Sequence, residues 1–571
     1  MIKPRKAVME MKDYNPPTSD RGGYLRMDFN ENTIGCSPFV IKAFKSIKPE
    51  KLSIYPQYRE LREAIAYYCN VNPAEVIPTN GTDEAIKSMF EIYLEKSKDE
   101  AILPVPTYAM FKFYAQLNEA LIKEVPYNKD LSFPTKRLLN SIGDKTKIIV
   151  LVNPNNPTGT SIKERDIIKI IQKAQKYNAI VLIDEAYYQF YGRTAIPLIN
   201  KYDNLLVIQT FSKAFGLAGL RLGYIISNKD NISIIQKALS PYSVNNAVVV
   251  CAIEALKNLE YTKKYIQEVK RSKKILCNSL DSLQIKYYPS DANFVLLRIG
   301  DKAERFCQKL RQKGILVRNR SSDTLLYGCV RITLGAGKQT RRLISAISEA
   351  IRKINPLLIF DIDGVLADAS KSYRIAIKKT AEYFTEQKIG VKEVQDYKSK
   401  SGYNNDWDLT DAIIKSRGKN IPKKKIIKKF QQYYLKLRNN EKWLLDKSIL
   451  KALSKKYRLA ILTGRPRNEA FYLLNKNNAN NYFSAIIAME DAGRQKPYPD
   501  GFFRIMEILD NRDAYYFGDA IDDIKAAIAA NIIPIGVLPP QDKSAKLRKT
   551  LIKNGAKRVL SNINKVEEAI I

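Results

Sequence analysis

The stretch LLVIQTFSKAFGLAGLRLGY, residues 205–224, is the most informative segment for the fold of the first part of the chain. Its apolar beginning predicts a buried strand, and its glycines predict a turn. Lys213 directly follows that strand, with the hydroxyls of Thr210 and Ser212 just before it and the guanidinium of Arg221 further along. Hydroxyl and guanidinium groups suit phosphate. We therefore predict an anion site with a lysine at the carboxyl end of a strand.

Further apolar runs alternate with helical patterns along the whole chain, which is typical of parallel α/β sheets. One series comprises residues 101–105, 147–152, 179–183 and 205–209, and a second comprises 357–360, 458–462, 514–517 and 534–538. The series meet at Asn355-Pro356, after an amphipathic stretch (343–354) that predicts a closing helix. A chain of 571 residues is too long for one core. We predict domains at 1–355 and 356–571.

Two other segments complete the predicted anion site. In VLIDEAY, Asp184 ends a buried strand, where its carboxylate can keep a pyridine nitrogen protonated. In NGTDEAI, the residues Gly81, Thr82 and Asp83 stand at a predicted helix start, whose free N–H groups attract an anion. Transamination needs a lysine for a Schiff base, a carboxylate and a phosphate cradle. The sequence therefore predicts a site for pyridoxal 5′-phosphate.

This set of motifs resembles the fold type I aminotransferases, and among them the histidinol-phosphate aminotransferases, over nearly all of residues 1–355. The matching stretches are DFNEN (28–32), YPQYRELREAIA (55–66), NGTDEAI (80–86), PTYAMF (106–111), NPNNPTG (153–159), DEAYYQF (184–190), SKAFGLAGLRLGY (212–224), ILVRNR (315–320) and VRITLG (330–335). The resemblance implies a large domain at about 36–249 and a small domain at about 1–35 and 250–355.

The resemblance also implies roles for side chains around the cofactor. Tyr108 is expected to stack on the cofactor ring, and Asn156 and Tyr187 are expected to hydrogen-bond its phenolic oxygen. Tyr55 is expected to reach the phosphate of the partner subunit, which makes a homodimer the implied functional unit.

Arg318 and Arg331 match the pair that binds the substrate's own phosphate in this family, because a dianion calls for a bidentate guanidinium. Arg320 lies two residues from Arg318 and remains an alternative to it. The implied substrates are glutamate and imidazole acetol phosphate, and the implied product is histidinol phosphate.

The chain contains no histidine, which excludes Ser-His-Asp and Cys-His triads and His-ligated metals. Its six cysteines are widely spaced and form no CxxC pair, so neither a zinc site nor a disulfide framework is predicted. Any catalysis must use other side chains.

The stretch LLIFDIDGVL, residues 357–366, opens the second series of strands. It places Asp361 and Asp363 at a strand's carboxyl end, where two carboxylates attract a hard cation. An aspartate nucleophile, a second aspartate as acid and base, and Mg²⁺ together form a histidine-free route to phosphate ester hydrolysis. Thr463 and Lys496 follow later strands and offer a hydroxyl and a cation.

The ordered set DxDGV, strand-T-G, K-P and GDxxxD resembles the haloacid dehalogenase superfamily over residues 357–571. It implies a Rossmannoid domain with a helical cap at about 371–450. By this resemblance Asp361 is the nucleophile that forms an aspartyl phosphate, Asp363 is the general acid and base, and Thr463 and Lys496 bind phosphate. The implied metal ligands are Asp361, Asp363, Asp519 and Asp523, with Asp522 as an alternative to Asp523.

One segment of the predicted cap, GYNNDWDLTDAI (402–413), is expected near the pocket. An ordinary helix start is an equally good interpretation of its Asn and Asp residues.

The chain has a net charge of +36, of which +21 falls in 1–355 and +15 in 356–571. The excess is diffuse, and its densest run (423–430) alternates with apolar residues as a half-solvated helix does. We therefore predict no nucleic-acid partner. The sequence has neither a membrane-spanning stretch nor a signal peptide, and a cytoplasmic location is expected.

Together the motifs predict a bifunctional α/β enzyme of histidine biosynthesis that forms histidinol phosphate and then releases histidinol. One alternative is a threonine-phosphate decarboxylase-like or other pyridoxal phosphate enzyme fused to a phosphatase of unrelated specificity. Another is a basic nucleic-acid-binding or scaffold protein with relict active sites. The motifs do not fix the phosphatase substrate.

Overall fold

The computed structural model describes residues 2–11, 21–398, 405–509 and 511–570. The chain folds as two compact units, Met1–Ala350 and Ile351–Ile571, here called the N-unit and the C-unit. Helix α14 (Gly337–Ile354) runs across this boundary, and only Asn355 and Pro356 separate it from strand β14 (Leu357–Phe360). The predicted closing helix is confirmed, with an earlier start.

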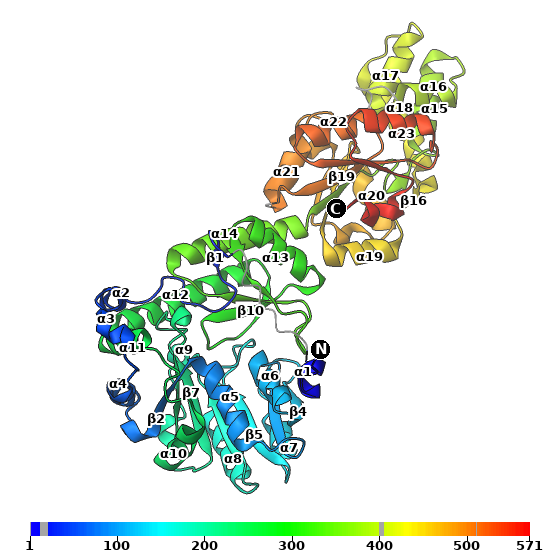
Figure 1. Ribbon diagram of the computed structural model, residues 1–571. Coiled ribbons are helices and arrows are strands. Elements are labelled where there is room, and N and C mark those ends of the chain that lie inside the picture. The colour runs from blue at the N-terminus through cyan, green and yellow to red at the C-terminus, as the bar shows by residue number, and fades with distance from the viewer. Residues whose placement is uncertain (1, 12–20, 399–404, 510, 571) are drawn as a thin grey trace. The chain divides into compact units, whose positions relative to one another are not determined.

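The N-unit is built on a seven-stranded sheet in the order β2-β8-β7-β6-β5-β3-β4 (Figure 1). In that order the strands are β2 (Val76–Thr79), β8 (Gly223–Ile226), β7 (Leu205–Thr210), β6 (Ile180–Asp184), β5 (Thr146–Val152), β3 (Glu100–Val105) and β4 (Leu121–Pro126). Strand β8 is antiparallel to its neighbours, and the other pairs are parallel. The carboxyl ends of β6 and β7 therefore lie side by side.

Helices cover both faces of this sheet, because alternate side chains of each buried strand point to opposite faces. Val181 and Ile183 of β6 join one core with α4 (Arg59–Cys69), α8 (Glu164–Gln175) and α11 (Asn246–Lys257). Leu182 joins the other core with α5 (Gly81–Tyr93), α6 (Ala109–Leu117) and α10 (Lys229–Ala238). The remaining helices before residue 200 are α1 (Lys6–Glu10), α2 (Pro38–Lys45), α3 (Pro49–Ser53), α7 (Thr135–Ser141) and α9 (Tyr188–Tyr191).

A second, antiparallel sheet of the N-unit has the order β12-β13-β10-β9. Its strands are β12 (Arg318–Asn319), β13 (Cys329–Thr333), β10 (Phe294–Arg298) and β9 (Lys286–Tyr288), and α12 (Leu259–Ser282) and α13 (Ala303–Gln312) belong to the same part of the chain. Near the amino terminus, β1 (Leu25–Arg26) pairs with β11 (Ile315–Leu316). This pairing brings the segment around residue 28 to the strands that carry the predicted substrate arginines.

The C-unit contains a parallel six-stranded sheet in the order β18-β17-β14-β19-β20-β21. Its other strands are β17 (Arg458–Leu462), β18 (Ala485–Ile487), β19 (Ala514–Gly518), β20 (Ile533–Val537) and β21 (Arg558–Leu560). The helices that accompany them are α19 (Lys447–Lys456), α20 (Arg467–Lys476), α21 (Asp500–Leu509), α22 (Ile521–Ala529) and α23 (Ala545–Lys553). Strand β14 is central, so its carboxyl end lies between those of β17 and β19.

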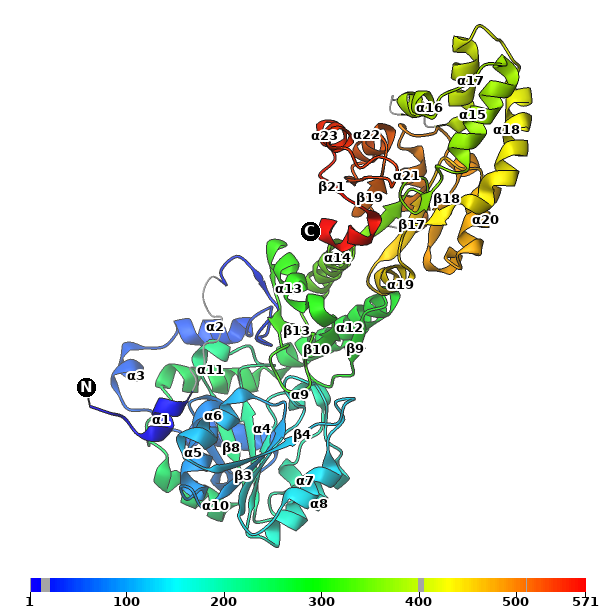
Figure 2. The same ribbon diagram turned by 90° about the vertical axis from the view of Figure 1, so that its right-hand side faces the viewer.

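A helical cap is inserted after β14 and stands apart from the sheet of the C-unit (Figure 2). It consists of α15 (Tyr373–Thr385), α16 (Val391–Lys398), α17 (Asp406–Ser416) and α18 (Lys423–Leu437), which share a core of their own. The chain enters and leaves the cap through the antiparallel pair β15 (Ala367–Asp368) and β16 (Lys442–Trp443). The basic run at 423–430 lies on α18, which buries Ile426 and Phe430, so the half-solvated helix is confirmed.

Among the described residues, no helix combines the length and the apolar character needed to cross a membrane.

Two candidate active sites

In the N-unit, the predicted carboxylate and lysine lie at neighbouring strand ends. Asp184 is the last residue of β6, and Lys213 follows the adjacent β7. Asp184 is buried, and its Oδ1 accepts a hydrogen bond of 2.9 Å from the backbone N–H of Ala186. Burial raises the pKa of Asp184 from 3.8 to about 7. A protonated ring nitrogen beside this carboxylate would lower that pKa again, so the site fits a pyridinium group.

Lys213 is held by the segment around residue 28. Its Nζ donates to the carbonyl oxygen of Phe29 at 3.0 Å and lies 5.8 Å from the centroid of the Tyr187 ring. The amide of Asn30 donates to the hydroxyl of Tyr187 at 3.0 Å. The stretch DFNEN therefore contacts the lysine and the tyrosine beside it, a role that its sequence alone did not predict.

The predicted phosphate cradle is formed where α5 begins beside β8. The hydroxyls of Thr210 and Ser212 lie 3.0 Å apart. Arg221 pairs with the carboxylate of Asp83 at 3.0 Å, and Tyr108 donates to that same carboxylate at 3.0 Å.

Gly81 opens α5, with Thr82 next to it, and its φ of +74° lies in the left-handed region. A Cβ on Gly81 would lie 2.6 Å from Arg221 Nη2. The left-handed conformation favours glycine here, and the start of α5 leaves backbone N–H groups free for an anion, so the cradle fits a phosphate group.

The two predicted substrate arginines face one another in the antiparallel pair of β12 and β13, where Arg318 is the register partner of Arg331. Arg331 is buried, donates to the side-chain oxygen of Asn156 and donates to the carbonyl oxygen of Asp28 at 2.5 Å. Burial lowers the pKa of Arg331 to about 10. Its Nε is buried and has no hydrogen-bond partner within the described part of the chain, as expected of a guanidinium that awaits an anion.

Other predicted residues of the N-unit lie differently. Arg320 forms an ion pair with Asp323, which favours Arg318 over it as the partner of Arg331. Tyr55 is 73% exposed and stacks on Tyr242 at 4.3 Å between ring centroids. A role of Tyr55 in a partner subunit's site therefore stays a prediction.

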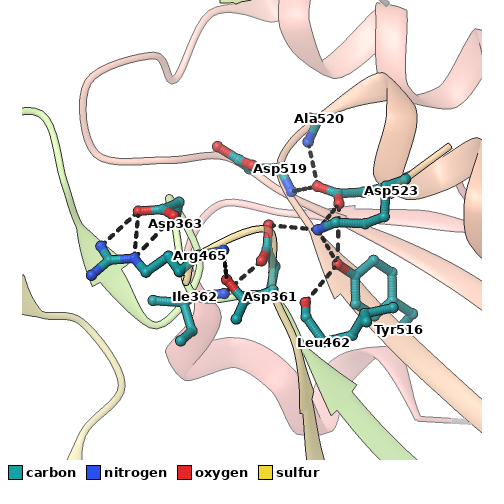
Figure 3. A network of polar contacts seen from close by, with 11 residues as sticks. Asp361, Ile362, Asp363, Leu462, Arg465, Tyr516, Asp519, Ala520 and Asp523 are labelled. Carbon is teal, nitrogen blue, oxygen red and sulfur yellow. Dashed lines mark hydrogen bonds and ion pairs between the residues drawn. The ribbon is translucent and has the colours of Figure 1, made fainter. Parts of the chain in front are cut away.

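In the C-unit, the predicted catalytic residues gather at the carboxyl ends of β14, β17 and β19 (Figure 3). Lys496 lies between two buried carboxylates, 3.1 Å from Asp361 and 2.6 Å from Asp523. It also donates to the hydroxyl of Tyr516 at 2.8 Å, and Tyr516 donates to Asp523 at 3.0 Å. The second oxygen of Asp523 accepts the backbone N–H groups of residues 519 and 520.

Three of the predicted metal ligands form one group: single oxygens of Asp361, Asp519 and Asp523 all lie within 4.8 Å of one another. Burial, opposed by Lys496, raises the pKa of Asp361 to about 7. Burial and the charges of Asp523 and Asp361 raise the pKa of Asp519 well above its ordinary value. A divalent cation would offset this repulsion, so the group fits Mg²⁺.

Asp363 lies outside that group of oxygens. Arg465 binds its carboxylate with both Nε and Nη2, the shortest distance being 2.7 Å, and Figure 3 shows the carboxylate pointing toward Arg465. Burial raises the pKa of Asp363, but Arg465 more than compensates and holds it below the ordinary range. Thr463 is buried, and its hydroxyl accepts the backbone N–H of Arg465 at 3.2 Å.

A cavity of about 330 Å³ is lined by Asp361, Asp363 and Asp519 at the sheet's carboxyl edge and by residues of the cap. Of the cap segment 402–413, residues 402–404 lie outside the described residues. Asn405 and Trp407 line the cavity, and Asn405 also accepts the backbone N–H of Trp407 at 2.9 Å at the start of α17. Both interpretations of this segment are therefore correct.

Comparisons with known proteins agree with these geometries. Residues 23–347 match the family model for aminotransferase class I and II, and residues 358–537 match that for haloacid dehalogenase-like hydrolases. The chain belongs to the class I and II aminotransferases. It carries in addition a haloacid dehalogenase-like hydrolase domain, so the predicted fusion is confirmed.

Relatives of this aminotransferase include the histidinol-phosphate aminotransferase of Caldanaerobacter subterraneus subsp. tengcongensis, which is 37% identical over 331 residues, or 57% of this chain and 93% of the relative. That of Methanocaldococcus jannaschii is 33% identical over 370 residues, or 61% of this chain and 98% of the relative.

Solved structures give the same fold. The histidinol-phosphate aminotransferase of Clostridium acetobutylicum is 23% identical with a TM-score of 0.54, covering 57% of this chain and 98% of its own. The histidinol-phosphate aminotransferase of Sinorhizobium meliloti, in complex with pyridoxal-5′-phosphate, is 22% identical with a TM-score of 0.55. The match covers 61% of this chain and 97% of that structure. The predicted fold class, a fold type I aminotransferase followed by a haloacid dehalogenase-like domain, is confirmed.

A buried carboxyl group of this two-part aminotransferase lies beside the second site and gives a testable pH dependence. Glu469 of α20 is 7% exposed, accepts the Gln431 amide at 2.6 Å, and has a second oxygen with no partner among the described residues. Burial, together with the charges of Asp363 and Glu490, raises the pKa of Glu469 from 4.5 to about 8. The folded state therefore retains this proton where the unfolded state has lost it.

This difference makes the folded C-unit less stable as the pH rises from 4.5 toward about 8. Glu469→Gln removes the charge, so we expect it to raise the melting temperature of the C-unit. The free energy of unfolding should increase by about 1 to 2 kcal/mol at about pH 8 and change little at about pH 5. Thermal unfolding at both pH values measures this, with the exposed Glu507→Gln as control. An equal effect at both pH values would contradict the assigned pKa.

Proposed function

We propose that the chain catalyses two consecutive steps: transamination between glutamate and imidazole acetol phosphate to give histidinol phosphate, followed by hydrolysis to histidinol and phosphate. The observation that carries the first step is the buried Arg331 beside its register partner Arg318, since the Nε of Arg331 has no hydrogen-bond partner among the described residues and suits a substrate phosphate. The names of the relatives support the same substrate. We propose histidinol phosphate as the phosphatase substrate because it is the product of the first step.

Pyridoxal 5′-phosphate is the proposed cofactor of the N-unit, and when bound it supplies an electron sink for the substrate's Cα. Asp184 would hold its ring nitrogen, and Tyr108 would stack on its ring. Asn156 and Tyr187 would bind its phenolic oxygen. The residues proposed for its phosphate are Gly81, Thr82, Thr210, Ser212 and Arg221, with Asp83 orienting Arg221.

Three residues of the N-unit act on the substrate in this proposal. Lys213 Nζ holds the cofactor at rest and then moves a proton at the substrate's Cα, since it is the amine at the end of β7. Arg331 and Arg318 bind the substrate phosphate and so fix the distance between that carbon and Lys213.

In the C-unit, we propose that an Asp361 carboxylate oxygen attacks the phosphorus of the substrate. The ester oxygen leaves with a proton from Asp363, which reacts in its protonated form although Arg465 favours the carboxylate. Water then attacks the phosphorus, releases phosphate from Asp361 and gives a proton back to Asp363. Thr463 and Lys496 would bind the phosphoryl oxygens. Mg²⁺, held by Asp361 and Asp519 with Asp523 beside them, would neutralise phosphoryl charge.

The same proposal includes a homodimer of the N-unit. The helices α2 and α3 and the residue after α3 expose large apolar side chains that a monomer would leave in water, namely Phe39, Ile41, Phe44, Leu52 and Ile54. The exposed Tyr55 continues this surface.

Sedimentation equilibrium tests the homodimer. We expect a mass twice that of the chain, and Phe44→Glu is expected to shift the equilibrium from the dimer toward the monomer.

The substrate choice of the N-unit can be tested at Arg331. Lysine keeps the charge but cannot form a bidentate contact, so Arg331→Lys is expected to lower kcat/KM for phosphorylated amino donors about ten- to a hundredfold. Non-phosphorylated aromatic donors offer this position no dianion, and we expect a small loss for them. Steady-state kinetics with both donors measure the two ratios; equal losses would mean that Arg331 supports the fold or the cofactor instead.

One coupled assay tests the whole proposal. Purified protein is incubated with imidazole acetol phosphate, glutamate and Mg²⁺, and histidinol and free phosphate are measured together. We expect both to form at equal rates after a short lag. Accumulation of histidinol phosphate would refute the phosphatase substrate, and decarboxylation of threonine phosphate in place of transamination would refute the first step.

A further inference from the structure

Arg465 connects two carboxylates that belong to different parts of the C-unit. Its Nε and Nη2 bind Asp363, and its Nη1 binds Glu441 at 2.9 Å. The side chains of Arg465 and Glu441 are 1% and 0% exposed, whereas that of Asp363 is 35% exposed and faces the cavity. One buried cation therefore holds a proposed proton donor and a carboxylate, that of Glu441, which is not among the residues that line the cavity.

Glu441 lies at the connection between cap and sheet. It directly precedes β16, which with β15 connects the cap to the sheet; we call these two strands the hinge strands. The other carboxylate oxygen of Glu441 accepts a hydrogen bond of 2.7 Å from the hydroxyl of Ser372. Ser372 lies between the other hinge strand, β15, and the first cap helix. The continuous contact chain Ser372–Glu441–Arg465–Asp363 therefore runs from both chain crossings of the cap to the edge of the cavity.

The guanidinium geometry makes this chain sensitive to orientation. A guanidinium is planar and rigid, so its edge toward Asp363 cannot turn without moving the N–H that holds Glu441. The ring of Tyr373, 4.7 Å from the guanidinium carbon, packs against it. A displacement of Glu441 with the hinge would thus be transmitted to Asp363.

We propose that Arg465 is a positioning residue through which the cap hinge, by way of Glu441, sets the orientation of Asp363 for proton transfer. The inference rests on the proposed phosphatase function, in which Asp363 gives its proton to the leaving oxygen as the bond from Asp361 to phosphorus forms and the ester bond breaks. An alkoxide needs that proton, whereas p-nitrophenolate leaves without it. A displaced Asp363 should therefore lower the rate of hydrolysis of alkyl esters more than that of aryl esters.

The test uses the full chain with p-nitrophenyl phosphate and the alkyl phosphate that the wild type hydrolyses fastest. We expect Arg465→Lys to lower kcat/KM for the alkyl ester at least about tenfold and that for the aryl ester less than about threefold. Glu441→Gln, which does not touch Asp363, should act in the same direction. The double variant should lose less than the product of the two single losses.

Matched variants separate the possible failures. Arg467→Lys changes an exposed arginine of the neighbouring helix that pairs with Asp491, and it should leave the ratio of the two esters unchanged. Asp363→Asn should show the largest selective loss; without it, the proposed role of Asp363 and this inference both fail.

If Asp363→Asn shows that loss but Arg465→Lys and Glu441→Gln keep the wild-type ratio with normal melting temperatures, the positioning role alone is refuted. A variant that loses activity on both esters equally also counts against the inference, because a general structural defect does not discriminate between leaving groups.

Discussion

Replacing Lys213 by alanine is expected to abolish transamination while phosphate release by the C-unit continues. Alanine has no amine to hold the cofactor or to move a proton at the substrate carbon, and proton transfer alone accounts for about 10²- to 10⁴-fold in rate. We therefore expect a loss of at least about 10³-fold, measured as 2-oxoglutarate formed from glutamate.

The same variant has a spectroscopic readout. The wild type should be yellow, with a visible absorbance that borohydride removes, and Lys213→Ala should lack that band. Lys237→Ala, on the exposed side of α10, serves as control and should match the wild type. Transamination within about tenfold of wild type in the Lys213 variant would show that another residue holds the cofactor.

Replacing Asp361 by asparagine is expected to eliminate Mg²⁺-dependent phosphatase activity and to leave transamination unchanged. An amide is neither a nucleophile nor an anionic ligand, so the variant loses both the attacking oxygen and one member of the metal group. We expect phosphate release to fall by at least about 10³-fold.

Stability measurements distinguish this effect from misfolding. The carboxylates of Asp361 and Asp523 both pair with Lys496, and burial raises the pKa of Asp361. Removing the charge of Asp361 should therefore not lower the melting temperature. Asp446→Asn makes the same chemical change at an exposed helix N-cap, where asparagine is an equally good cap, and should leave both activities intact. Full phosphatase activity in the Asp361 variant, or phosphatase activity of the wild type that persists in excess chelator, would refute the proposed mechanism.

Residue patterns along the chain were sufficient to predict the elements that carry the sites. An apolar run followed by a polar residue locates a strand end, and Asp184, Lys213 and Asp361 lie at or just after strand ends as predicted. The start of α5 at Gly81 was equally predictable, because a glycine before an amphipathic run indicates a helix terminus.

The partners of these residues were not predictable in the same way. Lys213 meets the Phe29 carbonyl across 184 positions, and Asp363 meets Arg465 across 102. Periodicity shows which face a side chain occupies but not which distant segment lies opposite it. No sequence pattern predicted the role of Glu441. A single glutamate after a helix is usually solvated, whereas the side chain of this one is fully buried.

The separate core of the cap has an evolutionary consequence. Its buried side chains, such as Ile377, Ile413 and Phe430, pack on one another, while the sheet's core is formed by other residues. Substitutions of the described cap residues that alter the cavity's lining are therefore expected to leave β14, and Asp361 directly after it, in place. If the proposed positioning role holds, we expect specificity for a new leaving group to arise by substitution within the cap, with Ser372 and Glu441 at its two connections to the sheet retained.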